Sequence, residues 1–320
     1  MNIRYSIIYS VSNISVEIIK RWIDLVSQCF VPQSIISKVT SRGKFTKYNR
    51  EKLFDNLEKE LDNSIISIYL TDNNNSFSIV KNANEGSLLI TFNMSQSEIL
   101  DWDTEIDKCM VSEDIVVAYE CSDKDFYWQN TDNILSYQVE GKSLDDVKLT
   151  YRKFGLKEQI VDIEYNPGHE HRVHGTWFGS CYRMWFGKRY YQCIEKDKLK
   201  NYKNCYENVE LENDVVRITL YKDIWEYNES TNREIQWDFR NSVEMDKVAH
   251  ALEKGLIHEN TDPEIEITNG TFSNGGTKLI KYYYDLNGKL VQRSKAKKVR
   301  VCEFNQEGLL LVENKVEICD

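Results

Sequence analysis

The chain has 320 residues, of which 41% are hydrophobic, 29% charged and 12% aromatic, and its formal net charge is −10. This length and composition predict a globular protein with a well-buried core, and they argue against a disordered chain. No run of eighteen apolar residues occurs, so no membrane-spanning segment is predicted. The acidic balance argues against a nucleic-acid-binding protein, because phosphate contacts need a basic patch.

Eight cysteines are spread along the chain, and no two of them lie within eleven residues of each other. This spacing excludes CxxC metal knuckles and redox pairs, and free thiols fit a reducing compartment. The N-terminal apolar run is too short for a secretory signal and has no small-residue cleavage site. We therefore expect a cytoplasmic protein.

Residues 1–125 have the element order of an α+β layer. Runs rich in β-branched and aromatic residues alternate with amphipathic helical segments, one of which follows Ser15. Ser95 and Glu98 have the spacing of a capping box at the start of the last helix. The predicted strands cover 3–9, 64–71, 76–81, 87–93 and 114–121, and a second helix covers 50–61. This order predicts a ferredoxin-like, split βαβ layer with residues 31–63 as an insertion.

Residues 126–262 form a second predicted domain, which is a mixed α+β region rich in aromatic residues. Strands are expected at 160–165 and 215–222, and one or two more between 175 and 193, joined near Gly187. A helix is expected to begin at Asn241 or Ser242 and to end at Gly255.

Residues 263–320 form the third predicted domain, a set of antiparallel β-hairpins. The Asn287-Gly288 pair between two strand patterns is a hairpin signal, because a type I′ turn needs positive φ at both central residues. The predicted fold class is therefore α+β, with domains at 1–125, 126–262 and 263–320.

Three of the five histidines, His169, His171 and His174, lie in one short segment. On a strand, residues i and i+2 share a face and can chelate zinc, and a third ligand with an open position would make a hydrolytic site. The alternative function is accordingly a metal-dependent hydrolase or nuclease that uses these histidines. Histidines in loops more often cap backbone groups or pair with acids, and no cofactor is needed in that case. P-loop, dinucleotide-binding, nucleophile-elbow and HExxH motifs are absent.

Ten acidic residues lie between positions 98 and 125, against two lysines. An acidic surface of this density attracts a basic partner and speeds its association. The alternative is a solvated helix face. From this stretch we predict that Glu98, Asp101, Asp103, Glu105 and Asp107 bind a partner.

The segment WFGSCYRMWFGKRYY, residues 177–191, combines the residue types that are enriched at the centres of protein interfaces. Trp177, Tyr182 and Trp185 are therefore predicted as further partner-binding residues. The alternative is that these rings pack in the core of a sheet.

The segment GTWFGSCYRMWFGKRYYQC, followed by ITLYKDIWEYNESTNREIQWDFR, resembles uncharacterised proteins of bacterial toxin–immunity loci. The resemblance covers residues 175–240 and includes no catalytic motif. It implies a cytoplasmic antidote that binds and blocks one toxin. The expected function is thus that of a non-enzymatic immunity protein whose acidic surface meets a basic toxin domain, without a cofactor.

Overall fold

The computed structural model describes residues 2–10, 15–62, 65–82, 87–95, 102–112, 114–145, 147–152, 157–173, 175–258, 264–267, 278–286, 288, 290–291, 293, 296–304 and 310–317. The chain divides into two compact units, Met1–Ala249 and His250–Asp320. Helices and strands both contribute to the structure, which confirms the predicted α+β class. Among the helices of these described ranges, none combines the length and apolar character that a bilayer crossing requires.

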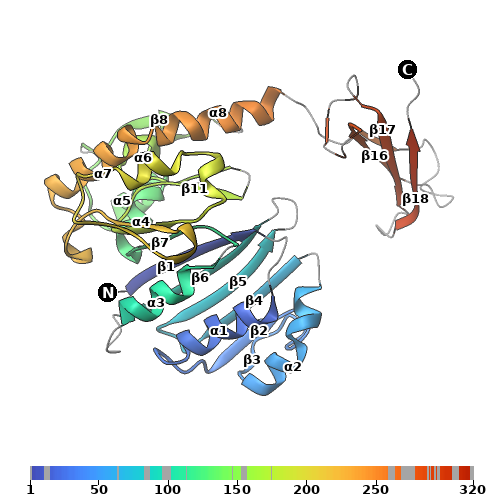
Figure 1. Cartoon of the computed structure of the whole chain (residues 1–320), viewed down its shortest axis with the longest axis horizontal. Helices are drawn as coiled ribbons and strands as arrows, with labels where there is room; N and C mark the ends of the chain where they lie inside the picture. Colours follow the sequence, from blue (N-terminus) through green and yellow to red (C-terminus); the bar gives the residue numbers. More distant parts are fainter. Residues whose placement is uncertain are drawn as a thin grey trace. The chain divides into compact units, whose positions relative to one another are not determined.

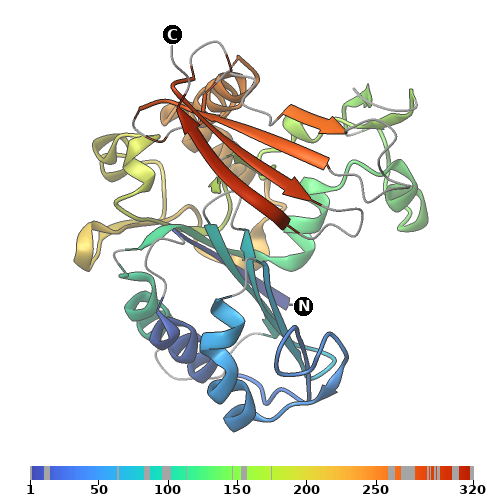
Figure 2. The same cartoon turned by 90° about the vertical axis from the view of Figure 1, so that its right-hand side faces the viewer.

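The first unit is built around one large antiparallel sheet (Figures 1 and 2). Within the described residues its strand order is β13-β14-β12-β7-β1-β6-β5-β4-β2-β3. The strands are β1 Asn2–Ser10, β2 Ser34–Ser37, β3 Thr46–Lys47, β4 Ile65–Thr71, β5 Ser76–Asn82, β6 Ser87–Ser95, β7 Ile115–Ser122, β12 Arg183–Phe186, β13 Glu207–Glu210 and β14 Val216–Thr219. Two separate hairpins pair β8 Leu149–Tyr151 with β9 Gln159–Val161, and β10 His171–Val173 with β11 Thr176–Phe178.

Helices connect most of these strands. They are α1 Val16–Val26, α2 Arg50–Leu61, α3 Trp102–Met110, α4 Asp123–Asn130, α5 Ile134–Val139, α6 Lys196–Lys200, α7 Ser230–Ser242 and α8 Met245–His258. Short 3₁₀ helices are η2 Ile163–Tyr165, η3 Tyr190–Gln192, η4 Glu212–Asp214 and η5 Ile224–Glu226. The boundaries of α2 agree with the predicted helix, and the Asn49 side chain caps it by accepting from the backbone N–H of Lys52.

The N-terminal part of the sheet has the predicted ferredoxin-like arrangement. Strands β6 and β7 both pair antiparallel with β1, so they run parallel to each other with β1 between them. Helix α3 connects these two parallel strands, which makes β6–α3–β7 a split βαβ unit. The predicted insertion is present as β2, β3 and α2, and β4 also belongs to it, because β4 and β2 extend the sheet beyond β5.

Strand β1 is covered on both faces, because its alternate side chains point to opposite sides of the sheet. The Tyr5 hydroxyl accepts a hydrogen bond from Trp102 Nε1 of α3 at 3.0 Å. The adjacent Arg4 faces the other way, with its guanidinium 4.3 Å from the centre of the Phe126 ring on α4. Helices α3 and α4 therefore lie on opposite faces of the sheet, as Figure 1 shows.

The same sheet continues into the region that the sequence assigns to a second domain. Strand β12 pairs antiparallel with β7, and β14 and β13 follow it. Gly187 ends β12 where it lies close to β7, and a Cβ atom there would come within 2.1 Å of the Ile115 carbonyl oxygen. One sheet thus joins residues 1–125 to residues 126–262.

Three local predictions in the middle region need correction. The strand predicted at 160–165 ends at Val161, and the 3₁₀ helix η2 follows it. Helix α7 was not predicted, because its buried residues include the polar Asn232, Gln236 and Arg240 and so give no apolar period. Helix α8 begins at Met245 and not at Asn241 or Ser242, which are the last residues of α7, and it continues through Gly255 instead of ending there.

The second unit contains a four-stranded antiparallel sheet. Its order is β15-β16-β17-β18, with bounds Glu264–Ile267, Lys278–Tyr284, Lys298–Phe304 and Leu310–Glu317, which confirms the predicted hairpins. Tyr283, Val291 and Ala296 form a small buried cluster against which Val299 packs, and Cys302 is also buried. In the predicted turn, Gly288 has φ +84°, whereas Asn287 lies outside the described residues.

Candidate functional site

The acidic stretch of residues 98–125 is a set of internal ion pairs in the structure. Glu98, Asp101 and Glu113 lie outside the described residues, and we call the other seven acids the acidic seam. Every acid of the seam lies within 3.6 Å of a basic nitrogen. The pairs join Asp103 and Glu120 to Arg183, Glu105 to Lys108, Asp107 to Arg217, Asp114 to Arg189, Asp123 to Arg4 and Asp125 to Arg233. Most of the arginines come from beyond residue 175, so the seam fastens the middle region to the N-terminal layer.

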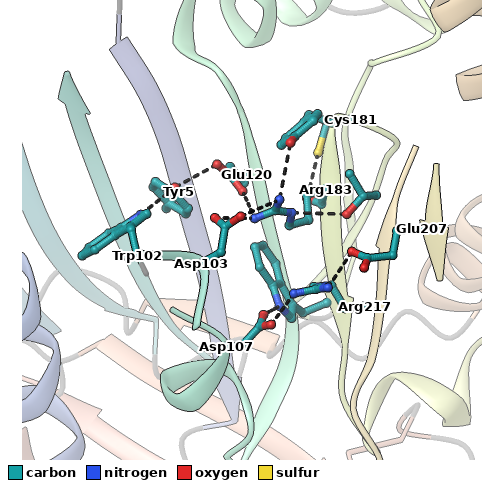
Figure 3. A network of polar contacts seen from close by, with 12 residues as sticks. Tyr5, Trp102, Asp103, Asp107, Glu120, Cys181, Arg183, Glu207 and Arg217 are labelled. Carbon is teal, nitrogen blue, oxygen red and sulfur yellow. Dashed lines mark hydrogen bonds and ion pairs between the residues drawn. The ribbon is translucent and has the colours of Figure 1, made fainter. Parts of the chain in front are cut away.

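Arg183 on β12 is the centre of the seam (Figure 3). The strand register sets it opposite Glu120 of β7 on one side and Thr219 of β14 on the other. Its guanidinium donates to both carboxylate oxygens of Asp103 at 2.9 and 3.2 Å, and Nη1 lies 3.2 Å from Glu120. Nε donates to the Thr219 hydroxyl at 3.2 Å, and the Tyr5 hydroxyl donates to Glu120 at 2.8 Å. One arginine therefore links three strands and a helix.

Arg217 on β14 makes a second, less buried centre beside the first (Figure 3). It pairs with Asp107 of α3, whose other carboxylate oxygen accepts from Trp185 Nε1 at 2.8 Å. Its second amino group lies 2.6 Å from Glu207 of β13. This arrangement ties α3 to the outer strands of the sheet.

Burial raises the pKa of three carboxyl groups of the seam. It raises the pKa of the Glu120 carboxyl, although the Arg183 charge opposes the rise. Burial likewise raises the pKa of Asp125, against the effect of Arg233, and the pKa of Asp107, against the hydrogen bond from Trp185. The desolvation penalty of these charged carboxylates thus exceeds the stabilisation that their partners provide, which is common for buried ion pairs.

The aromatic residues predicted to bind a partner lie in the interior. Trp177 and Trp185 are 1% and 0% exposed, and Tyr182 is 9% exposed. Trp177 stacks on Tyr119 of β7, with 4.3 Å between the ring centres. The prediction that these tryptophans contact a partner directly is therefore wrong. Their rings pack in the core, as in the alternative, because both faces of the sheet are covered.

The histidines predicted to bind zinc do not form an open site at His169. This residue is 4% exposed, and its Nδ1 lies 2.6 Å from the Asn166 carbonyl oxygen. Its Nε2 lies 2.6 Å from the guanidinium of the fully buried Arg240, which also pairs with Asp246. Both ring nitrogens are engaged, so His169 cannot ligate a metal without breaking this network. His171 is half-buried on β10, and His174 lies outside the described residues.

A groove between α4 and α5 is the candidate site that the sequence did not indicate. We call it the α4–α5 groove, and its volume is about 680 Å³. Around it, Tyr127, Leu135 and Val139 are 49%, 61% and 75% exposed. Its lining residues are Asn2, Asp123, Lys124, Tyr127, Trp128, Asn133, Leu135, Ser136, Val139 and Glu140. Because α4 carries aromatic residues at three successive positions, its sequence shows no single apolar face.

The aromatic side chains of the groove are held in place by neighbours. The Trp128 ring meets Tyr127 and Tyr137 edge to face, with centres 5.0 and 4.9 Å apart. Lys142 places its ammonium 4.6 Å from the centre of the Trp128 ring. The Tyr127 hydroxyl hydrogen-bonds to Ser136 at 2.9 Å. The groove is therefore pre-formed, which lowers the entropy cost of binding.

Comparison with known proteins adds no assignment. No protein-family model matches this chain, and no curated protein sequence is significantly similar to it.

Proposed function

We propose that this chain is a non-enzymatic protein-binding protein of the immunity type, and that its partner docks on the α4–α5 groove. The observation that carries this proposal is the exposure of Tyr127, Leu135 and Val139 around one pre-formed groove. Clustered exposed apolar side chains mark interaction sites, and Tyr and Trp are enriched among the residues that dominate binding energy.

The charge of the chain supports a basic partner, such as the toxin domain that the resemblance implies. The net charge is −10, and Asp123 and Glu140 lie at the groove beside Lys124. Long-range attraction from such a charge speeds the encounter with a basic protein. The acids of the seam contribute less to this attraction than their number suggests, because each of them has a basic partner. We therefore expect a moderate dependence of the association rate on salt.

The alternative hydrolase is not proposed, because its first histidine is used elsewhere. His169 hydrogen-bonds through both ring nitrogens, to Asn166 and Arg240. A metal bound there would have to displace the buried guanidinium of Arg240.

The proposal is tested with the purified chain and the product of the neighbouring reading frame. Titration calorimetry gives the Kd of the wild type and of a Leu135→Asp, Val139→Asp double variant. We expect the double variant to raise Kd about tenfold or more, since it puts two charges into an apolar contact. Val31→Asp is the matched control, because Val31 is 74% exposed, close to the 75% of Val139. Equal Kd values for all three proteins, or no binding by the wild type, would refute the proposal.

A further inference from the structure

A second cavity lies on the other face of the sheet, between α1, α3 and the 3₁₀ helix η4. We call it the α1–α3 pocket, and its volume is about 390 Å³, which is within the range of small-molecule sites. Its lining residues are Tyr9, Ile18, Arg21, Trp22, Lys108, Cys109, Val111, Ser112, Glu212 and Asn213. Apolar and polar side chains are thus combined in one cavity, which is not part of the α4–α5 groove.

The pocket brings together hydrogen-bond donors and positive charge. The Tyr9 hydroxyl is fully buried and accepts from Trp22 Nε1 at 2.7 Å, so its own O–H remains available to donate. Arg21 donates through one amino group to the Lys108 carbonyl oxygen at 3.0 Å, which fixes the guanidinium at the pocket. Lys108 also lines the pocket, but its ammonium is paired with Glu105 at 2.6 Å, so Arg21 is the main cation of the lining. Glu212 is the acid of the lining.

The remaining lining is mostly apolar, with Ser112 and Asn213 as its polar members. Ile18, Trp22 and Val111 supply hydrocarbon and ring surface. Asn213 of the lining and the following Asp214 are consecutive left-handed residues, with φ of 55° and 61°. The Asn213 side-chain amide donates to the Val111 carbonyl oxygen at 2.7 Å, and the Tyr191 hydroxyl donates to the Asp214 carbonyl oxygen at 2.5 Å. These contacts hold η4 in a conformation that is uncommon for residues other than glycine.

We propose that the α1–α3 pocket binds a small amphipathic anion, a carboxylate or sulfonate carried on an aromatic or short aliphatic body. Arg21 and the Tyr9 hydroxyl receive the anionic group, since both donate hydrogen bonds and Arg21 is cationic. Ile18, Trp22 and Val111 receive the apolar body. The site is independent of the α4–α5 groove, with which it shares no lining residue.

Naphthalene-2-carboxylate is a suitable probe, because it has the anionic group and the size that the pocket requires. Its binding to the full chain is measured by titration calorimetry and compared with that of naphthalene-2-methanol, which has the same rings without the charge. We expect one site per chain, with the carboxylate bound about tenfold more tightly than the alcohol.

Three variants locate the site. Arg21→Gln should weaken carboxylate binding about tenfold and leave the alcohol unchanged, whereas Ser112→Trp should abolish binding of both by filling the pocket. Arg50→Gln is the matched control, since Arg50 is an exposed arginine paired with Asp24 of α1, and it should bind like the wild type. Circular dichroism melts confirm that each variant is folded. Absence of binding at millimolar probe, or binding that ignores Arg21→Gln and Ser112→Trp, overturns the proposal.

Discussion

The acidic seam and the α4–α5 groove use their side chains in opposite ways. In the seam, seven acids that look exposed in the sequence are paired with basic side chains, most of which follow residue 175 in the chain. In the groove, aromatic and aliphatic side chains that look like core residues remain open to solvent. The acids of the seam therefore contribute to assembly of the fold, and we propose that the exposed apolar side chains of the groove contact a partner. Changes in the seam should alter stability, and changes in the groove should alter binding.

The largest loss of stability is expected when Arg183 is replaced. An Arg183→Met variant leaves the buried Glu120 and its neighbour Asp103 without their shared cation. Breaking a buried pair by removing one partner costs about 3–5 kcal/mol. Urea denaturation should show a loss of this size. Arg50→Met breaks the exposed pair with Asp24 and should lower the unfolding free energy by only about 0–1 kcal/mol. Similar losses for the two variants would contradict the structural role of the Arg183 ion pairs.

A smaller loss of stability is expected at Trp185. Trp185→Phe keeps a ring in the fully buried site but removes the hydrogen bond from Nε1 to Asp107. A hydrogen bond to a charged group contributes about 1.5–3 kcal/mol, and the smaller ring adds a cavity. The unfolding free energy from urea denaturation measures the sum. Trp225→Phe, in η5, is a comparison without such a bond to the seam, and it should lose less.

The pH dependence of the unfolding free energy tests the direction of the Glu120 pKa shift. Burial raises the pKa of Glu120 in the folded state, so the folded chain holds this proton more tightly than the unfolded chain. The resulting stability is present below the unfolded pKa and is lost as pH rises through the folded pKa. Glu120→Gln has no such dependence. Its unfolding free energy relative to wild type should therefore increase as pH rises above the usual Glu range, and a decrease would show that Arg183 outweighs burial.

The smallest expected effect on stability is in the groove. Leu135→Asp with Val139→Asp changes two side chains that are 61% and 75% exposed, so the melting midpoint should change little. Exposed substitutions of this kind alter the unfolding free energy by about 0.5 kcal/mol or less. A larger loss would mean that the groove is part of the packed core and not a binding surface.

The N-terminal layer could be predicted because its signals are local. Ser15 and Asn49 cap their helices, and the strands have short β-branched runs bounded by turn residues. The seam could not be predicted, because Arg183 and Glu120 meet only through the register of β12 against β7. That register also places the aromatic stretch in the core, where sequence composition alone allows a surface role.

The groove and α7 escaped prediction for a related reason. Helix α7 buries Gln236 and Arg240, which donate to the Ser180 and His169 carbonyl oxygens, so polar groups occupy its inner face. In α5, Leu135 and Val139 are exposed although their residue types favour burial. In both helices the tertiary contacts override the hydrophobic period that sequence analysis relies on.

The most direct test compares one variant from each region against the same partner. Asp103 is the most accessible member of the seam, with a side chain 62% exposed, and Asp103→Asn is set beside the Leu135→Asp, Val139→Asp double variant. The measurement is the Kd for the neighbouring reading frame's product, with the unfolding free energy of each variant taken in parallel. We predict that the groove variant alone raises Kd about tenfold or more, and that Asp103→Asn keeps the wild-type Kd with a small loss of stability, because Asp103 is mostly exposed. A Kd that rises with Asp103→Asn and ignores the groove variant would contradict this prediction and restore the acidic surface as the site of recognition.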